Sequence, residues 1–300
     1  MAKNQKGRAR TTIIILAISI AAIAAVIFLS GSDRNWRVTP EGVLEYPKCT
    51  PEYQLSILET RDNYSLYEVS FASRCTQIAG LMRVPTPEVD VPGIVLLPGA
   101  AVTKEGEQGL AKYLCSLGYA SITIDQRKLG ALDIQADLQM FLNGEEPIEH
   151  KMVHDALAAA AVLRHQPGID PERIVFAGES NGARFAIIAC ALDPDACGVI
   201  AVSTCGYGVD SAITSGALND PEVIRFYKSI DPDRYLSKIP PRKFVMIHSR
   251  NDTIIAYENA QWTYAKVLAP KKLHTIEIAT HGYCNEMAAY LDTELDAMVS

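Results

Sequence analysis

Residues 174–188 read Ile-Val-Phe-Ala-Gly-Glu-Ser-Asn-Gly-Ala-Arg-Phe-Ala-Ile-Ile. The first four are apolar and predict a short buried strand, and the apolar residues after Gly182 predict a helix. Between them, residues 178–182 fit the pattern Gly-x-Ser-x-Gly. In this context the pattern is typical of a nucleophile elbow, a strand-to-helix turn so tight that its flanking positions accept only small side chains. Ser180 is therefore the predicted nucleophile, and the alternative is an inert serine in a glycine-rich turn.

The segments on both sides of this turn alternate between short apolar runs and helical patterns. Further buried strands are predicted at 93–97, 119–125, 198–203, 243–248 and 273–279. Helices are predicted at about 105–117, 147–165, 257–268 and 285–299. This alternation indicates an α/β fold with a mostly parallel central sheet flanked by helices.

Two further segments extend this core. Residues 53–60, 66–73 and 77–84 alternate with a period of two, which predicts an antiparallel lead-in sheet. Residues 204–241 form a long connection containing several glycines and prolines, and they predict a cap-like insertion.

The composition indicates one sizeable domain behind a basic N-terminus. The chain has 300 residues, of which 48% are hydrophobic and 21% charged, and this is enough to bury the core of a large α/β domain. The formal net charge is −7, and residues 1–32 carry four cations and no acids, so residues 33–300 carry −11. This acidic balance argues against nucleic acid as a partner.

The N-terminal residues predict a membrane anchor. Residues 13–29 contain one serine and no charge, and as a helix they would span roughly 25 Å, at the short end for crossing a bilayer. The preceding cations predict that residues 1–12 form a cytoplasmic basic tail and that the rest of the chain lies outside. A cleaved signal peptide and a secreted product are the alternative, but the apolar run is longer than a signal-peptide core. We therefore expect an uncleaved signal anchor, a linker at 30–52 and a folded domain at 53–300.

Two residues after Ser180 are candidates for its partners. A serine hydroxyl needs a base to accept its proton, and the base needs an orienting carboxylate. In an open parallel sheet, functional residues gather at the carboxyl ends of strands. Asp252 and His281 each lie just past a predicted strand, so we predict a triad of Ser180, Asp252 and His281. Weaker candidates for the acid are Asp210, Asp231 and Asp233.

An oxyanion hole needs two hydrogen-bond donors. The backbone amide of Asn181 is one candidate, because it lies at the start of the helix after the nucleophile. The second is expected from the loop after the strand at 93–97, where Gly99 allows close approach and Ala100 is the predicted donor.

In its nucleophile turn, predicted triad and oxyanion loop, the chain resembles an α/β-hydrolase over roughly residues 53–300. Within that superfamily it is similar to the catalytic domains of dienelactone hydrolases, acetyl xylan esterase-like enzymes and the prolyl oligopeptidase family. The matching pieces are Leu97-Pro98-Gly99, Asp125-Gln126-Arg127, Asp170-Pro171-Glu172-Arg173-Ile174, residues 178–182, Asp252 and His281-Gly282. The resemblance implies a Ser-Asp-His hydrolase without a cofactor.

The chain departs from these families at several points. Dienelactone hydrolases use a cysteine nucleophile where this chain has Ser180, and the usual His-Gly before the oxyanion loop is Pro98-Gly99 here. Prolyl oligopeptidases carry a large propeller, for which residues 30–90 are far too few. These departures favour a small esterase over a peptidase.

We therefore expect a membrane-anchored serine hydrolase of the carboxylesterase type, which cleaves small acyl esters through an acyl-enzyme intermediate. A serine peptidase or amidase using the same triad is one alternative, and a non-catalytic binding protein with this fold is another. The expected partners are a small acyl ester or peptide substrate and a membrane bound through residues 13–29. No cofactor and no metal ion are expected.

The seven cysteines could form disulfides, and two histidines have a spacing that could bind a metal ion. Outside the cytoplasm, disulfides are permitted, and plausible pairs are Cys49–Cys75, Cys190–Cys197 and Cys205–Cys284, with all seven cysteines reduced as the alternative. His150 and His154 are four residues apart on a predicted helix, a spacing that can place two metal ligands on one face. A polar helix face is the favoured interpretation.

Overall fold

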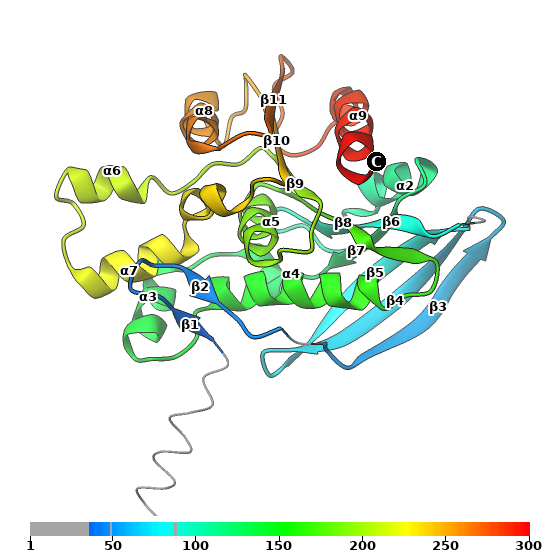
Figure 1. Cartoon of the computed structure of the whole chain (residues 1–300), viewed down its shortest axis with the longest axis horizontal. Helices are drawn as coiled ribbons and strands as arrows, with labels where there is room; N and C mark the ends of the chain where they lie inside the picture. Colours follow the sequence, from blue (N-terminus) through cyan, green and yellow to red (C-terminus); the bar gives the residue numbers. More distant parts are fainter. Residues whose placement is uncertain (1–35, 49, 87–88) are drawn as a thin grey trace, which may run out of the picture. The chain divides into compact units, whose positions relative to one another are not determined.

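The apolar runs of the sequence become the strands of one large sheet. The computed structural model describes residues 36–48, 50–86 and 89–300. The chain divides into Met1–Arg37 and Val38–Ser300, and the second unit contains this sheet. Its nine strands have the order β11-β10-β9-β8-β6-β7-β5-β4-β3 (Figure 1). In chain order they are β3 (Tyr53–Arg61), β4 (Tyr64–Ser73), β5 (Thr76–Pro85), β6 (Val91–Leu97), β7 (Ala120–Ile124), β8 (Ile169–Glu179), β9 (Gly198–Val202), β10 (Lys243–Ser249) and β11 (Lys271–Ile276).

The predicted lead-in strands form an antiparallel meander at one edge of this sheet. β3 pairs with β4, and β4 pairs with β5, where Phe71 lies opposite Ile78. β5 then pairs antiparallel with β7, with Met82 opposite Ile122. Phe71 and Met82 are buried, whereas the edge strand β3 is largely exposed. The lead-in strands therefore belong to the same sheet as the parallel strands.

The order of the parallel strands creates a crevice at their carboxyl ends. β6 lies between β7 and β8, the two strands that follow it in the chain, and it pairs in parallel with both. The chain therefore leaves β6 toward one side and returns on the other, and this is the topological switch point at which open α/β sheets place their sites. Residues 98–101 follow β6 and Ser180 follows β8, so both emerge at this point.

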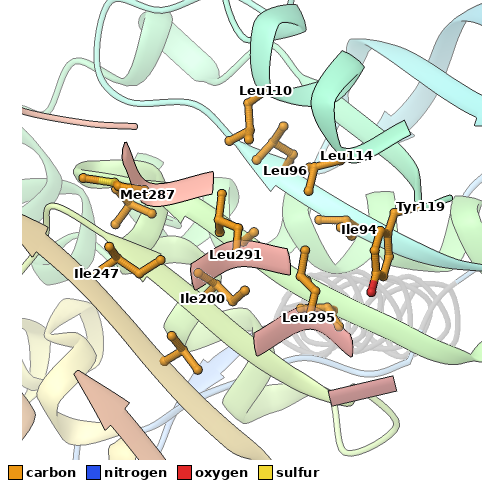
Figure 2. Close-up of a cluster of buried hydrophobic side chains, with 14 of the residues drawn as sticks. Ile94, Leu96, Leu110, Leu114, Tyr119, Ile200, Ile247, Met287, Leu291 and Leu295 are labelled. Carbon is orange, nitrogen blue, oxygen red and sulfur yellow. The ribbon is translucent and has the colours of Figure 1, made fainter. Parts of the chain in front are cut away.

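Helices cover both faces of the sheet. α4 (Ile148–Arg164) and α5 (Asn181–Leu192) pack on each other and on β8. Figure 2 shows the opposite face, where α2 (Gln108–Ser116) and α9 (Ala288–Val299) enclose a buried cluster. Ile94 and Leu96 of β6 belong to that cluster, and their spacing of two directs both to the same face. β7 and β9 are buried along their whole length, as expected for strands covered on both sides.

Some elements differ from the sequence-based expectation. Residues 134–142, to which no element was assigned, form α3 (Ile134–Leu142), whose first turn is capped by the side chain of Asp133. β8 begins at Ile169, within the predicted turn, because Ile169 extends the ladder by pairing with Val91. The predicted insertion at 204–241 contains α6 (Val209–Thr214), α7 (Pro221–Ile230) and two 3-10 turns, η2 (Pro232–Arg234) and η3 (Leu236–Lys238). The remaining elements are η1 (Arg127–Gly130), α8 (Tyr257–Lys266) and η4 (Asn285–Met287).

The described part of the predicted linker contains regular structure. β1 (Arg37–Val38) and β2 (Leu44–Glu45) form a two-stranded sheet. Leu44 is fully buried, and its backbone N–H donates a hydrogen bond of 2.9 Å to the hydroxyl of Tyr235. The predicted tail at 1–12 and anchor at 13–29 lie outside the described residues. Within residues 36–48, 50–86 and 89–300, no helix has the length and apolar character needed to cross a membrane.

Candidate active site

Ser180 occupies a strained backbone position between β8 and α5. Its φ of 53° and ψ of −117° lie in a region that L-residues rarely adopt, and holding serine there costs about 1 kcal/mol. Its N–H donates to the carbonyl of Val202 at 2.9 Å, and its carbonyl accepts from the hydroxyl of Thr204 at 2.8 Å. Neighbouring structure therefore fixes the turn on both sides of the serine, as a nucleophile elbow requires.

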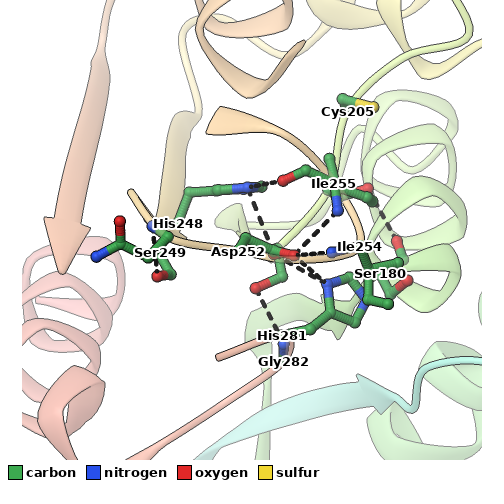
Figure 3. Close-up of polar contacts among 12 residues, drawn as sticks. Ser180, Cys205, His248, Ser249, Asp252, Ile254, Ile255, His281 and Gly282 are labelled. Atoms are coloured by element: carbon green, nitrogen blue, oxygen red, sulfur yellow. Dashed lines mark hydrogen bonds and ion pairs between the residues drawn. The ribbon is translucent and has the colours of Figure 1, made fainter. Parts of the chain in front are cut away.

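Asp252 and His281 lie together beyond β10 and β11. Nδ1 of His281 lies 2.9 and 3.0 Å from the two carboxylate oxygens of Asp252 (Figure 3). The Asp252 carboxylate also accepts the backbone N–H groups of Ile254 and Ile255 at 2.8 and 3.0 Å. Burial acts to raise the pKa of Asp252, but the Ile255 amide and His281 outweigh it, so the pKa is lowered. Asp252 is therefore an anion that holds the imidazole with its proton on Nδ1.

Backbone contacts hold the loop of His281 against the nucleophile turn. The N–H of Gly282 donates to the Ser203 hydroxyl at 3.0 Å, and Ser203 directly follows β9, the neighbour of β8. Figure 3 shows the imidazole of His281 between Asp252 and Ser180. The three residues of the predicted triad thus lie in one cluster, brought together by loops that follow three different strands.

The loop after β6 passes beside Ser180. A Cβ atom built on Gly99 would lie 3.6 Å from the Cβ of Ser180, so the predicted oxyanion residue Ala100 adjoins the nucleophile. The N–H of Ala101 donates to the carbonyl of Leu129 at 2.7 Å and fixes the loop. Among the described residues, no backbone carbonyl accepts a hydrogen bond from the N–H of Ala100.

Asn181 begins α5, and its backbone N–H belongs to the first turn, whose amides lack intrahelical acceptors. The side chain of Asn181 binds other groups and not its own backbone N–H. The Oδ1 atom accepts from Nη1 of Arg184 at 2.9 Å, and Nδ2 donates to the carbonyl of Gly130 at 3.3 Å. Asn181 and Ala100 thus both lie beside Ser180 in the structure, and their role as oxyanion donors stays a prediction.

His248 is a buried neighbour of the acid. Its Nε2 lies 2.9 Å from the carbonyl of Ile255 and 3.5 Å from Oδ2 of Asp252. Burial lowers the pKa of His248, so at neutral pH it is uncharged and does not compete with His281 for the carboxylate. His248 is therefore a packed, hydrogen-bonded side chain.

Sequence reasoning missed two groups beside the nucleophile. One is Ser203, whose hydroxyl binds the Gly282 amide. The other is Glu179, a half-buried carboxyl group directly before Ser180. The available signal was a charged residue directly after the apolar run at 174–178, where a charge is costly without a partner.

The histidine pair on α4 has separate hydrogen-bond partners. His150 Nε2 lies 2.7 Å from the hydroxyl of Ser229, whereas His154 Nδ1 lies 2.8 Å from that of Ser73. Burial lowers the pKa of His150 to about 3 and that of His154 to about 4. Among the described residues, no group of three or more His, Cys, Asp or Glu side chains is arranged to hold a metal ion.

Two of the predicted disulfides are wrong. Cys190, Cys197, Cys205 and Cys284 are free thiols. Cys190 is fully buried on α5, and the Sγ of Cys197 donates instead to the carbonyl of Glu172 at 3.1 Å. Cys205 lies against the guanidinium of Arg184, at 3.9 Å. The third predicted pair involves Cys49, which lies outside the described residues.

Residues 36–240 match the model of the acetyl xylan esterase (AXE1) family. The chain belongs to the acetyl xylan esterase (AXE1) family. This match covers Ser180 and the two predicted oxyanion residues, whereas Asp252 and His281 lie beyond it. The predicted resemblance to α/β-hydrolases, and to acetyl xylan esterase-like enzymes in particular, is confirmed.

Solved structures of two acetyl xylan esterases are similar in fold to this chain. Acetyl xylan esterase 1 from a Thermoanaerobacterium species superposes with a TM-score of 0.70 at 14% identity, over 84% of this chain and 89% of that one. An acetyl xylan esterase from a Paenibacillus species gives 0.68 at 17% identity, over 83% and 89%. These likenesses show an α/β-hydrolase-like fold.

A curated relative matches part of the chain. The protein YfhR of Escherichia coli is 26% identical over 140 residues, which is 45% of this chain and 47% of YfhR, so the chain spans about half the length of that relative. Together, the family and the esterase neighbours support an enzyme that is a carboxylic ester hydrolase.

Proposed function

We propose that this AXE1-family chain hydrolyses short acyl esters through a triad of Ser180, His281 and Asp252. The observation that carries the proposal is the hydrogen-bonded pair of His281 and Asp252, at 2.9 and 3.0 Å, beside a serine held at a positive φ. The acidic partner is buried and ionised, so it can orient the imidazole and stabilise its protonated form.

In the proposed reaction, Nε2 of His281 accepts the proton of Ser180 while the serine oxygen attacks the acyl carbonyl carbon. The amides of Asn181 and Ala100 bind the resulting oxyanion. The tetrahedral intermediate then expels the alcohol, which takes the proton from His281, and the acyl group stays on Ser180. A water molecule gives a proton to His281 and attacks this acyl-enzyme, which releases the acid and restores the serine.

An acetyl group is the acyl group that the family favours. Acetyl xylan esterases give the family its description, and an acetyl ester needs only a small acyl pocket. A peptidase of the prolyl oligopeptidase type is less well supported, because residues 53–85 form three strands of the main sheet and no propeller precedes it within the described residues.

The proposal predicts that a fluorophosphonate will label the protein on Ser180 and that 4-nitrophenyl acetate will be turned over. The label should be found by mass spectrometry on the peptide that contains Ser180, and His281→Ala should slow labelling by at least about 100-fold because it removes the base. Turnover of peptide amides in preference to acetate esters would indicate the peptidase alternative. A protein that neither labels nor hydrolyses esters would support the non-catalytic alternative.

We also propose that residues 13–29 anchor the chain in a membrane, with residues 1–12 in the cytoplasm and the hydrolase domain outside. The support is the uncharged run of 17 residues behind four cations. The full chain is expected to stay in the membrane pellet after a carbonate wash, and a chain without residues 1–31 is expected in the supernatant. Recovery of a secreted product shortened at its N-terminus would show that the segment is a cleaved signal peptide.

A further inference from the structure

A buried and a half-buried carboxyl group lie together beside the nucleophile turn. Glu179 directly precedes Ser180 at the end of β8, and Glu107 is the N-cap residue of α2. They lie close enough that each carboxyl group shifts the pKa of the other, and Glu107 is only 5% exposed. Both line a cavity of about 550 Å³ that is also bounded by Tyr113 and Tyr283. The mechanism proposed above uses neither carboxyl group.

The pair must hold a proton. Two carboxylates in contact repel each other, and burial adds to the penalty, so one of them stays protonated. Burial and the charge of Glu179 together raise the pKa of Glu107 to about 8. Among the described residues Oε1 of Glu107 has no hydrogen-bond partner, which suits a neutral acid better than a carboxylate. At neutral pH Glu107 therefore donates its proton in a hydrogen bond to the carboxylate of Glu179.

The groups that face this pair come from two elements. Tyr113 belongs to α2, and His281 and Tyr283 belong to the loop after β11. No lysine or arginine of the described residues forms an ion pair with Glu107 or Glu179. The proton between the two carboxyl groups is therefore what balances their charge.

Glu179 also holds the loop that carries His281. The backbone N–H of Tyr283 faces its carboxylate and acts to lower the pKa of Glu179. Its Oε2 atom lies 2.5 Å from the place that a Cβ on Gly282 would occupy, and only glycine permits this approach. The preceding amide, that of Gly282, binds Ser203. Both amides that follow His281 are thus fixed by residues next to the ends of β8 and β9.

We propose that Glu179, through a proton shared with Glu107, is a positioning residue that holds the His281 loop against the nucleophile turn. This inference rests on the proposed role of His281 as the base. Loss of the shared proton would place two carboxylates in contact, and their repulsion would displace Glu179 from the Tyr283 amide. The imidazole would then lose its alignment with Ser180, so kcat would fall while substrate binding changed little.

The test measures kcat and KM of the full chain for 4-nitrophenyl acetate between pH 6 and pH 10. We expect the parent kcat to decline above pH 8, with about one-tenth of the pairs still protonated at pH 9. Glu107→Gln keeps a hydrogen-bond donor that cannot be titrated. The ratio of its kcat at pH 9 to that at pH 7 should therefore be about tenfold higher than in the parent.

Glu105→Gln is the matched control, because it removes a carboxylate two residues away whose side chain is 61% exposed. It should keep the pH profile of the parent. A parent without an alkaline decline near pH 8, or Glu107→Gln with the same decline as the parent, would overturn the proposal.

A second measurement does not depend on activity or on the folding of Glu107→Gln. Hydrogen exchange of the amides of residues 282 and 283 is followed by mass spectrometry in the parent and in Glu179→Gln. We expect at least tenfold faster exchange at residue 283 in the variant, and unchanged protection there would overturn the proposal. A further outcome is faster exchange at residue 283 in Glu179→Gln while the parent has no esterase activity. In that case Glu179 still holds the His281 loop, and only the proposed function fails.

Discussion

Ser180→Ala is expected to lower kcat for acetate ester hydrolysis by about 10⁴-fold or more and to leave the fold intact. The variant removes the only atom that can form the acyl-enzyme. It keeps the backbone hydrogen bonds of the turn, from the Ser180 N–H to Val202 and from Thr204 to the Ser180 carbonyl. Any remaining turnover would come from substrate held by the oxyanion amides without a covalent step.

The measurement is the steady-state rate with 4-nitrophenyl acetate, together with thermal unfolding followed by circular dichroism. Ser116→Ala is the control, because this exposed serine lies on α2 and its hydroxyl donates only to the nearby carbonyl of Tyr113. The control should keep the parent rate. A Ser180→Ala variant that retained most of the activity would remove Ser180 from the mechanism.

Gly182→Ala is expected to destabilise the domain by about 3 kcal/mol and to impair the site. A Cβ at this position would overlap the carbonyl oxygens of Leu97 and Pro98. Because these are backbone atoms, no side-chain rotation relieves the overlap, and α5 must move away from the end of β6. The same carbonyls begin the loop of Ala100, so the predicted oxyanion hole would shift as well.

The urea concentration at the midpoint of unfolding measures this effect. Gly109→Ala is a matched control, because a Cβ on Gly109 of α2 would meet no atom within 4 Å. Removing a helical glycine should stabilise the protein by up to about 1 kcal/mol. If Gly182→Ala unfolded at the parent midpoint, the close approach of α5 to the end of β6 would not be a constraint on the fold.

The parts of the fold that the sequence predicted are those decided by local pattern. The stretches at 93–97 and 198–202 are apolar throughout, since both faces of these strands are buried. The chain order and the strand ends sufficed to select Ser180, Asp252 and His281, which lie together in the structure, and their catalytic roles remain predictions. The segment at 134–142 was missed because its helix depends on a cap from Asp133 more than on a long apolar stripe.

Features that depend on distant partners were not predictable from pattern. Glu107 and Glu179 are 72 residues apart in the chain and meet only because α2 and β8 pack near each other. The pairing of Cys190 with Cys197 was wrong for a similar reason. Nearness in the chain does not fix side-chain direction, and the Cys197 sulfur points to the carbonyl of Glu172.

The backbone strain at Ser180 sets two selective pressures against each other. Glycine adopts a φ of 53° without the penalty that serine bears, so selection for stability alone would favour glycine at this position. Only selection for a hydroxyl group at the switch point favours serine. A descendant of this chain that no longer needed the reaction would therefore become more stable through one substitution, and the return to serine would be opposed by folding itself.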